Sequence, residues 1–286
     1  MQNILSLDLG GSSIKYGLYD IKGTAKSDSH VKEINRIFSL DKLIETIDSI
    51  YQQYENIDGI GMSLPGVVDK TTRVISIGGA IPCLDGVDLQ KILHEKYNIP
   101  ISVENDANCA TLAEFWLGNG RGCTNLVCIT IGTGIGGGTV INNKLYTGSH
   151  SFASEFGIMY NTPNNNAKVN FSQQAATSML VEKANKIDSS ITNGKEFFAN
   201  IQRPEIKIVY DHWITDIARS IYNIAVVIDP DKVLLGGGIS SQDMIYNDIK
   251  EAIDDLASYP YYWVVEPCKF RNDAGKIGAV YGLAML

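Results

Sequence analysis

The sequence predicts an α/β protein made of two structurally related lobes, and three observations lead to this fold class. Stretches typical of buried strands alternate with stretches whose apolar residues recur at three- and four-residue steps, as on one face of a helix. A strand, a glycine-rich turn with a hydroxyl residue and a second strand occur near residue 8, and this pattern returns near residue 131. The chain of 286 residues, 44% of them hydrophobic, is also long enough for two separate cores.

The first half of the chain opens with a hairpin and continues with alternating helices and strands. Strands are expected over residues 4–10, 14–21, 57–63 and 101–103, and helices over residues 40–54, 88–97 and 107–117. Pro100 ends the second helix, because proline disfavours helix at the residue before it. Gly118, a residue type common at helix ends, stops the third helix. Asn105 and Asp106 are therefore expected at a turn between a strand and a helix.

The second half repeats the strand, turn and strand and then becomes mainly helical. Strands are expected over residues 126–131 and 139–142, and residues 233–240 combine a buried strand with a glycine turn. The strongest helical pattern covers residues 206–228. An apolar helix is expected from about residue 275, and the polar residues 161–167 are expected to form a surface loop.

The repeat places the domain boundary near residue 118. We expect an N-terminal small lobe over residues 1–117 and a C-terminal large lobe over residues 118–286. The apolar helix of residues 275–286 is the one segment of the second half that we expect to be able to pack back onto the small lobe.

Composition narrows the classes of partner. The net charge of −8 argues against a nucleic-acid surface, because neutralising phosphates requires clustered Lys and Arg. No apolar run approaches membrane-spanning length and the N-terminus lacks the features of a secretion signal, so no membrane partner is expected. Five cysteines, an odd count without the spacing of a disulfide framework, fit a reducing cytoplasm. A small molecule is the expected partner.

Three glycine-rich turns, each directly after an apolar strand, are candidates for binding ATP. They are residues 8–15 (DLGGSSIK), 132–138 (GTGIGGG) and 236–240 (GGGIS). Successive backbone amides in such turns form a concave anion site. A tight connection without a ligand explains any one turn equally well, but three together favour a nucleotide, with two turns on the phosphates and the third over the nucleoside. Asp8 could hold Mg²⁺ through water, and Lys15 could reach a phosphate, although a lone Lys on a strand is more often solvated.

A dehydrogenase is the competing class of enzyme. Gly132, Gly134 and Gly137 match the fingerprint that binds NAD, but that fingerprint opens a helix. Residues 138–142 are rich in β-branched side chains and typical of a strand. The glycines are therefore expected inside a hairpin, which favours a phosphate clamp for ATP.

Three further motifs lie between the glycine turns: residues 63–69 (SLPGVVD), 104–110 (ENDANCA) and 155–157 (EFG). In their order and spacing the six motifs resemble the ROK family (repressors, open reading frames and kinases), over nearly the whole chain. The resemblance implies the actin-like ATPase (ribonuclease H-like) fold, with a duplicated mixed β-sheet core and a nucleotide cleft between two lobes. It also implies transfer of the γ-phosphoryl group of Mg-ATP to a hydroxyl of a hexose or hexose derivative, with the 6-OH expected.

The same resemblance assigns roles to single residues. Asp106 matches the catalytic base, and Asn105 and Glu155 match ligands of sugar hydroxyls. Gly66 and Gln173 are counted with the substrate-binding residues. The nucleotide loops are matched by Asp8, Gly10, Gly11, Ser12, Lys15, Gly132, Thr133, Gly134, Gly237 and Gly238.

The chain departs from the family pattern in two places. Many members follow the Glu-x-Gly motif with a His and a Cys-rich knuckle that together bind structural zinc, but here Ile158 replaces the His and residues 161–167 contain no Cys. Gln173 stands where the family often has a sugar-binding Glu. We therefore expect no zinc. The changes resemble a subset of members that act on N-acetylmannosamine, β-glucosides or other sugars, so glucose, fructose, N-acetylmannosamine and β-glucosides all stay open as substrates.

Other interpretations stay open at this point. Asp106 is also a favoured N-cap of a helix, and Glu155 is also typical of an exposed loop acid. The non-enzyme alternative is a catalytically inactive, sugar-sensing regulatory protein, since the family includes repressors. Asp8 lies so close to the N-terminus that no DNA-binding module is expected before it. A homodimer is an expectation that comes from the family alone.

Overall fold

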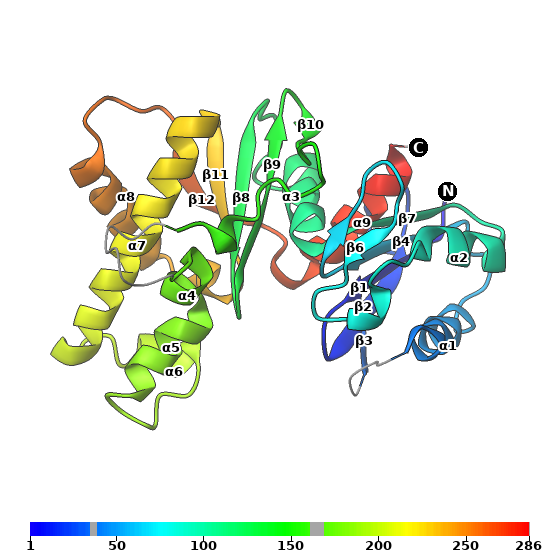
Figure 1. Cartoon of the computed structure of the whole chain (residues 1–286), viewed down its shortest axis with the longest axis horizontal. Coiled ribbons are helices and arrows are strands. Elements are labelled where there is room, and N and C mark those ends of the chain that lie inside the picture. Colours follow the sequence, from blue (N-terminus) through cyan, green and yellow to red (C-terminus); the bar gives the residue numbers. More distant parts are fainter. Residues whose placement is uncertain (35–38, 161–168, 286) are drawn as a thin grey trace. The chain divides into compact units, whose positions relative to one another are not determined.

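The computed structural model describes residues 1–34, 39–160 and 169–285, and the chain divides into two compact units (Figure 1). The first unit consists of Met1–Gly118, Thr147–Ala153 and Asn272–Leu286, and the second of Asn119–Tyr146 and Ser154–Arg271. Each unit is built on a five-stranded mixed sheet, with the strand orders β3-β2-β1-β4-β7 and β10-β9-β8-β11-β12. The α/β fold with a duplicated mixed sheet, expected from the repeated pattern, is therefore confirmed.

The sheet of the first unit begins with the expected hairpin. Its strands are β1 (Ile4–Leu9), β2 (Ser13–Tyr19), β3 (His30–Glu33), β4 (Gly59–Leu64) and β7 (Ile101–Asn105). The first three strands are antiparallel, whereas β4 and β7 run parallel to β1. The register pairs Asp8 with Lys15 on β2 and with Ser63 on β4. A carboxylate, an ammonium and a hydroxyl are thus gathered at one end of three neighbouring strands.

Helices and a small hairpin complete the first unit. The helices are α1 (Leu40–Tyr51), α2 (Leu89–Tyr97), α3 (Asp106–Leu117), α9 (Ala274–Ala284) and the short 3-10 turn η1 (Pro82–Leu84), and the hairpin strands are β5 (Val67–Val68) and β6 (Ile75–Ile77). Helix α9 comes close to β4 and α3. A Cβ on Gly61 would lie 2.5 Å from the carbonyl oxygen of Ala279, and one on Gly278 would lie 1.8 Å from that of Cys109. Glycine at both positions allows this packing.

The segment Thr147–Ala153 belongs to the first unit although it lies within the second half of the sequence. Lys70 explains this placement. Its backbone N–H donates to Ser151 Oγ at 2.9 Å, and its Nζ donates to the carbonyl of Gly148 at 2.8 Å.

The second unit repeats the arrangement of antiparallel hairpins followed by parallel strands. Its strands are β8 (Leu126–Ile131), β9 (Ile135–Ile141), β10 (Lys144–Leu145), β11 (Lys232–Gly236) and β12 (Val264–Pro267). Its helices are η2 (Phe156–Ile158), α4 (Phe171–Ala175), α5 (Thr177–Asn185), α6 (Gly194–Ala199), α7 (Pro204–Ile228), η3 (Gly238–Ser241) and α8 (Met244–Leu256), and η4 (Arg271–Asp273) leads out of it. The long α7 starts with a proline in its first turn and ends at Asp229 in the left-handed region, just before Pro230.

Several boundaries differ from the sequence-based expectation. Helix α3 begins at Asp106 rather than at residue 107, because Asn105 is its N-cap and Oδ1 of that residue accepts from the backbone N–H of Asn108 at 3.0 Å. Helix α1 ends at Tyr51, three residues earlier than expected. Helix α8 and strand β12 were not expected, although Ile245, Ile249 and Ile253 of α8 follow a four-residue step. The loop expected over residues 161–167 lies outside the described residues.

Candidate active site

Asp8 is the centre of a polar cluster in the first unit. Ser63 Oγ donates to Asp8 Oδ1 at 2.7 Å, and Lys15 Nζ lies 3.9 Å from Oδ2. A Cβ on Gly275 would lie 2.5 Å from Oδ1, so the start of α9 contacts this carboxylate closely. Burial raises the pKa of Asp8, while the Ser63 hydroxyl and the charges of Lys15 and Lys276 pull the pKa down. The structure thus brings together two residues that the sequence predicted and adds Ser63.

Lys276 is a second residue of this cluster that the sequence analysis missed. It is fully buried, and its Nζ lies 2.8 Å from Oδ1 of Asp273 and donates to Oγ of Ser29. Buried lysines are rare unless they are paired. Its position in an apolar helix, far along the chain from residue 8, offered no local signal.

The turn between β1 and β2 holds Gly10, Gly11 and Ser12, and all three residues are exposed. The N–H of Gly10 donates to the carbonyl of Ser13 at 2.8 Å, which closes the turn. The carbonyl of Ser12 accepts from Ile34 at 2.8 Å. An exposed glycine turn of this kind can approach a phosphate closely.

Asn105 and Asp106 lie at the junction of β7 and α3. Asn105 Nδ2 donates to the carbonyl of Gly66 at 2.7 Å, while its Oδ1 caps the helix. Asp106 is exposed on the first helical residue, and its Oδ1 accepts from the N–H of Ala107 at 2.8 Å. The interpretation of Asp106 as the N-cap is therefore wrong, because Asn105 already performs that role.

Gly66 contributes to this junction through its backbone. Its φ is +109°, and a Cβ would lie 2.0 Å from the carbonyl oxygen of Ile77. Only glycine fits there without a shift of the backbone. Its carbonyl is the acceptor that holds the side chain of Asn105.

Glu104, next to Asn105, is another residue that the sequence analysis did not assign. Partial burial raises its pKa, although hydrogen bonds from Asn108 and Asn105 and the charge of Arg73 pull the pKa down.

Cys109 connects this junction with Asp8. Burial raises the pKa of the Cys109 thiol well above its ordinary value, and the charges of Glu104, Asp8 and Asp106 raise the pKa further. The predicted base and the predicted phosphate-loop acid thus lie within electrostatic reach of one thiol.

In the second unit the turn of Gly132, Thr133 and Gly134 is held by the start of α5. Gly132 N–H donates to the carbonyl of Gly134 at 2.9 Å, and Thr177 N–H donates to the carbonyl of Gly132 at 2.9 Å. Ser178 Oγ donates to the carbonyl of Thr133 at 2.7 Å. Helix α5 therefore fixes the shape of the turn.

A cavity of about 440 Å³ opens beside this turn. A Cβ on Gly132 or Gly238 would meet nothing within 4 Å, so both backbones face open space. Two of the predicted glycine turns thus line one cavity in this unit. The lining residues are Gly132, Thr133, Thr177, Ser178, Val181, Thr192, Asn193, Gly194 and Gly238.

Gly237 lies against the end of β8. Its φ is +87° and its ψ is −179°, a backbone conformation that residues other than glycine rarely adopt. A Cβ there would lie 2.1 Å from the carbonyl oxygen of Ile131. This close approach joins the turn after β11 to the turn after β8.

Glu155 lies at the start of η2 and is partly buried. Burial raises its pKa. Gly157 explains the Glu-x-Gly motif, since a Cβ there would lie 2.1 Å from the carbonyl oxygen of Ile135. The motif therefore packs closely against the first residue of β9. Ile158, which replaces the family's His, is 50% exposed.

Gln173 takes part in the capping box of α4. Its Oε1 accepts from the N–H of Asn170 at 3.0 Å, and its own N–H donates to Asn170 Oδ1 at 3.0 Å. The side chain is exposed. The cap accounts for the amide oxygen of Gln173.

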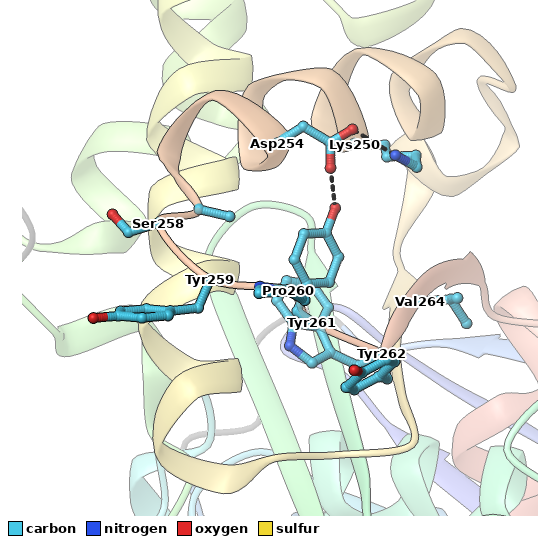
Figure 2. Close-up of a pocket in the computed structure, with 10 residues that line it drawn as sticks. Lys250, Asp254, Ser258, Tyr259, Pro260, Tyr261, Tyr262 and Val264 are labelled. Atoms are coloured by element: carbon cyan, nitrogen blue, oxygen red, sulfur yellow. Dashed lines mark hydrogen bonds and ion pairs between the residues drawn. The ribbon is translucent and has the colours of Figure 1, made fainter.

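A further cavity, of about 550 Å³, lies beside α8 and contains none of the predicted site residues (Figure 2). Asp254 lies between two partners in it, accepting from Tyr261 at 2.5 Å and from Lys250 at 2.5 Å. The rings of Tyr261 and Trp263 stack at 4.5 Å. None of the residues that line this cavity belongs to any of the six motifs.

The described residues contain neither a metal cluster nor a membrane-spanning helix. In residues 1–34, 39–160 and 169–285 there is no group of three or more His, Cys, Asp or Glu placed to hold a metal ion. Across the same described part of the chain, no helix combines the length and apolarity needed to cross a membrane.

Known proteins resemble this chain over its whole length. The sequence profile of the ROK family matches residues 4–284. A β-glucoside kinase of Listeria innocua is 32% identical, with 97% of this chain and 96% of the relative covered. The Lmo2764 protein of Listeria monocytogenes, proposed to be an N-acetylmannosamine kinase, superposes with a TM-score of 0.91 at 29% identity and 99% coverage of both chains.

A second solved structure gives the same result. A ROK family protein of Streptococcus pneumoniae TIGR4, in complex with sucrose, superposes with a TM-score of 0.88 at 29% identity, and 98% of this chain and 96% of that chain are covered. The six motifs, the duplicated sheet and a family profile that spans nearly every residue agree, and the chain belongs to the ROK family.

Proposed function

We propose that this protein is an ATP-dependent sugar kinase that transfers the γ-phosphoryl group of Mg-ATP to a sugar hydroxyl, expected to be the 6-OH. The observation that carries the proposal is the junction of β7 and α3, where Asn105 caps the helix and leaves the carboxylate of Asp106 exposed on its first residue. A β-glucoside kinase and a glucokinase each match nearly the whole chain, which supports the same activity.

The residues of the second unit fit the nucleotide. Two glycine backbones face the open cavity of about 440 Å³, and hydroxyl residues surround them. Such a cavity suits the nucleoside and phosphates of ATP, because amide N–H groups and hydroxyls donate to phosphate oxygens. In the first unit, Asp8 is a carboxylate of the kind that holds Mg²⁺ through water. When bound, Mg²⁺ supplies charge that stabilises the transferring phosphoryl group.

The proposed chemistry at Asp106 is that of a general base. The sugar oxygen forms a bond to the γ-phosphorus, the bond from that phosphorus to the bridging oxygen of ADP breaks, and the hydroxyl proton moves to the Asp106 carboxylate. General-base assistance of this kind contributes about 10²–10⁴-fold to the rate. Asn105 and Glu155 would hold other hydroxyls of the sugar.

For the substrate we propose a β-glucoside, ahead of glucose, fructose and N-acetylmannosamine. The relative that acts on β-glucosides is 32% identical over nearly the whole chain. Ile158 and Gln173 also stand where glucose-directed members often have His and Glu. The less polar Ile158 and the uncharged Gln173 are consistent with a sugar that carries a substituent.

A coupled ADP-release assay tests the proposal. Purified protein with Mg-ATP is given cellobiose, glucose, fructose, mannose or N-acetylmannosamine, and kcat/KM is measured for each. We expect the highest value for cellobiose. A higher value for another sugar would move the substrate assignment within the kinase class. ATP and sugar binding without turnover of any sugar would replace the kinase by the sugar-sensing protein.

The remaining parts of the proposal concern place and partners. Because ATP is the donor, we expect the enzyme to act in the cytoplasm. We expect a homodimer and no binding to nucleic acid. Sedimentation of the purified protein, alone and with duplex DNA, measures both.

A further inference from the structure

We propose that Glu104 is a positioning residue for phosphoryl transfer, which holds the turn that presents Asp106 through one carboxylate oxygen. The inference rests on the proposed kinase function and adds a residue to it. Glu104 is the fourth residue of β7 and pairs with Ser63 of β4 in the register of the sheet. Its backbone is therefore anchored before the turn begins.

A single atom of Glu104 contacts both sides of Asp106. Oε1 accepts from the backbone N–H of Asn105 at 2.8 Å and from Nδ2 of Asn108 at 2.9 Å. The backbone N–H of Asn108 in turn donates to Oδ1 of Asn105 at 3.0 Å. Glu104, Asn105 and Asn108 thus form a closed ring of three hydrogen bonds, and Asp106 lies within the segment that this ring closes.

The ring holds the segment of chain that carries Asp106. Its side chain is exposed, and its hydrogen bond to the N–H of Ala107 lies inside the same turn, so it moves with the turn. A displacement of a reacting group by about 1 Å can cost on the order of 10²-fold in rate. Loosening the ring should therefore lower kcat, whereas the nucleotide residues of the second unit are not touched.

The role of Glu104 is that of a hydrogen-bond acceptor and not of a base. Its Oε1 is occupied by two donors, and a glutamine has an acceptor oxygen at the same place. Glu104→Gln should therefore preserve the ring, while Asp106→Asn removes the basic oxygen. Comparing these two variants therefore distinguishes the role of the Glu104 carboxylate from that of the Asp106 carboxylate.

The experiment compares Glu104→Gln, Glu104→Ala, Asn108→Ala and the double variant Glu104→Ala/Asn108→Ala with the wild type. We expect Glu104→Ala to lower kcat about 10- to 100-fold with the KM for ATP within about 2-fold. Glu104→Gln should stay within about 3-fold of the wild type. The kcat of Asn108→Ala should lie between those of Glu104→Gln and Glu104→Ala. The kcat of the double variant should be no lower than that of Glu104→Ala, since either single substitution already breaks the same ring.

Asp48→Ala is the matched control. Asp48 accepts from Tyr97 and pairs with Lys96 at 2.8 Å in the same unit, away from the turn. The Asp48→Ala variant should have a lower melting temperature than the wild type and an unchanged kcat. Amide hydrogen exchange of residues 101–112 is the second readout, and it should speed up in Glu104→Ala and not in Asp48→Ala.

The outcomes separate this inference from the kinase proposal. If the wild type turns over no sugar, the kinase proposal fails while hydrogen exchange still reports on the ring. Wild-type-like kcat in Glu104→Ala would overturn the positioning role. A loss in Glu104→Gln as large as that in Asp106→Asn would also overturn it, because Glu104 would then act through its charge.

Discussion

At the scale of single residues, the chemistry proposed for Asp106 follows from its position one residue inside the helix. Asn105 is the N-cap of α3 and accepts from the backbone N–H of Asn108, so Asp106 is not needed in that role. The surroundings of Asp8 matter in the same way. The hydroxyl of Ser63 and the buried ammonium of Lys276 offset the cost of burying its carboxylate.

We predict that Asp106→Asn lowers kcat by at least about 10²-fold, because the amide keeps the volume but lacks the basic oxygen. ATP and sugar binding and the melting temperature should stay near the wild-type values. Asp41→Asn is the control, since Asp41 is also an acid in the first turn of a helix of the same unit. Steady-state kinetics and calorimetric titration measure both. A near-normal kcat in Asp106→Asn would remove Asp106 from the catalytic role.

A second residue-scale prediction concerns Gly237. An alanine would place a Cβ 2.1 Å from the carbonyl oxygen of Ile131, at a φ of +87°. Gly122 has a φ of +89°, and a Cβ there would meet nothing within 4 Å. Gly122→Ala should cost about 1 kcal/mol from backbone strain, and Gly237→Ala roughly 1–3 kcal/mol more from the clash. Denaturant unfolding gives the difference, and equal losses would contradict the close approach of the two turns.

At the scale of elements, two short helices hold the glycine turn after β8 in shape. Helix α5 donates from Thr177 and Ser178 to the carbonyls of the turn of Gly132 and Thr133. Helix α4 supplies Ser172, whose Oγ accepts from the N–H of Ile135 at 3.0 Å. The turn of Gly132 to Gly134 is therefore held by helices that follow it by about forty residues.

The element-scale prediction separates the two roles of Gln173. Gln173→Ala removes the capping box and the side-chain Nε2 together, whereas Asn170→Ala removes the cap acceptor and keeps the amide of Gln173. Each should destabilise α4 by about 1 kcal/mol. If Gln173 binds the sugar, Gln173→Ala alone should raise the KM for the sugar and change the sugar preference. An unchanged preference and affinity would leave Gln173 as a cap.

At the scale of the whole molecule, the two units repeat one sheet topology and carry different groups. The first unit holds the acids and the ammonium groups around Asp8 and the junction with Asp106. The second holds the cavity lined by two glycine turns.

The whole-molecule prediction is that the purified protein binds ATP or ADP in the presence of Mg²⁺ and contains no stoichiometric zinc. A structural zinc site needs four ligands in a closed geometry. A chelator should therefore leave the melting temperature unchanged, while Mg-ATP should raise it. Metal analysis and thermal melting provide the measurements. Tight NADH binding without ATP binding would favour the dehydrogenase, and zinc with unfolding on chelation would refute the zinc prediction.

The sequence by itself determined the family, the duplicated α/β fold and the motifs, because these depend on local periodicity and on glycine at fixed spacings. The repeat near residues 8 and 131 was sufficient to predict two related sheets. The roles assigned to the site residues stay predictions. The structure shows which groups surround each of these residues.

Only the tertiary structure decided which groups surround these motifs. Asn105 is held by Gly66, thirty-nine residues away in sequence, and Lys276 acts on the charge of Asp8 from the other end of the chain. Neither contact leaves a trace in local periodicity. Burial and hydrogen bonding between distant segments depend on how the helices pack on the sheet, and for this reason the contacts of Ser63, Glu104 and Lys276 could be recognised only after folding.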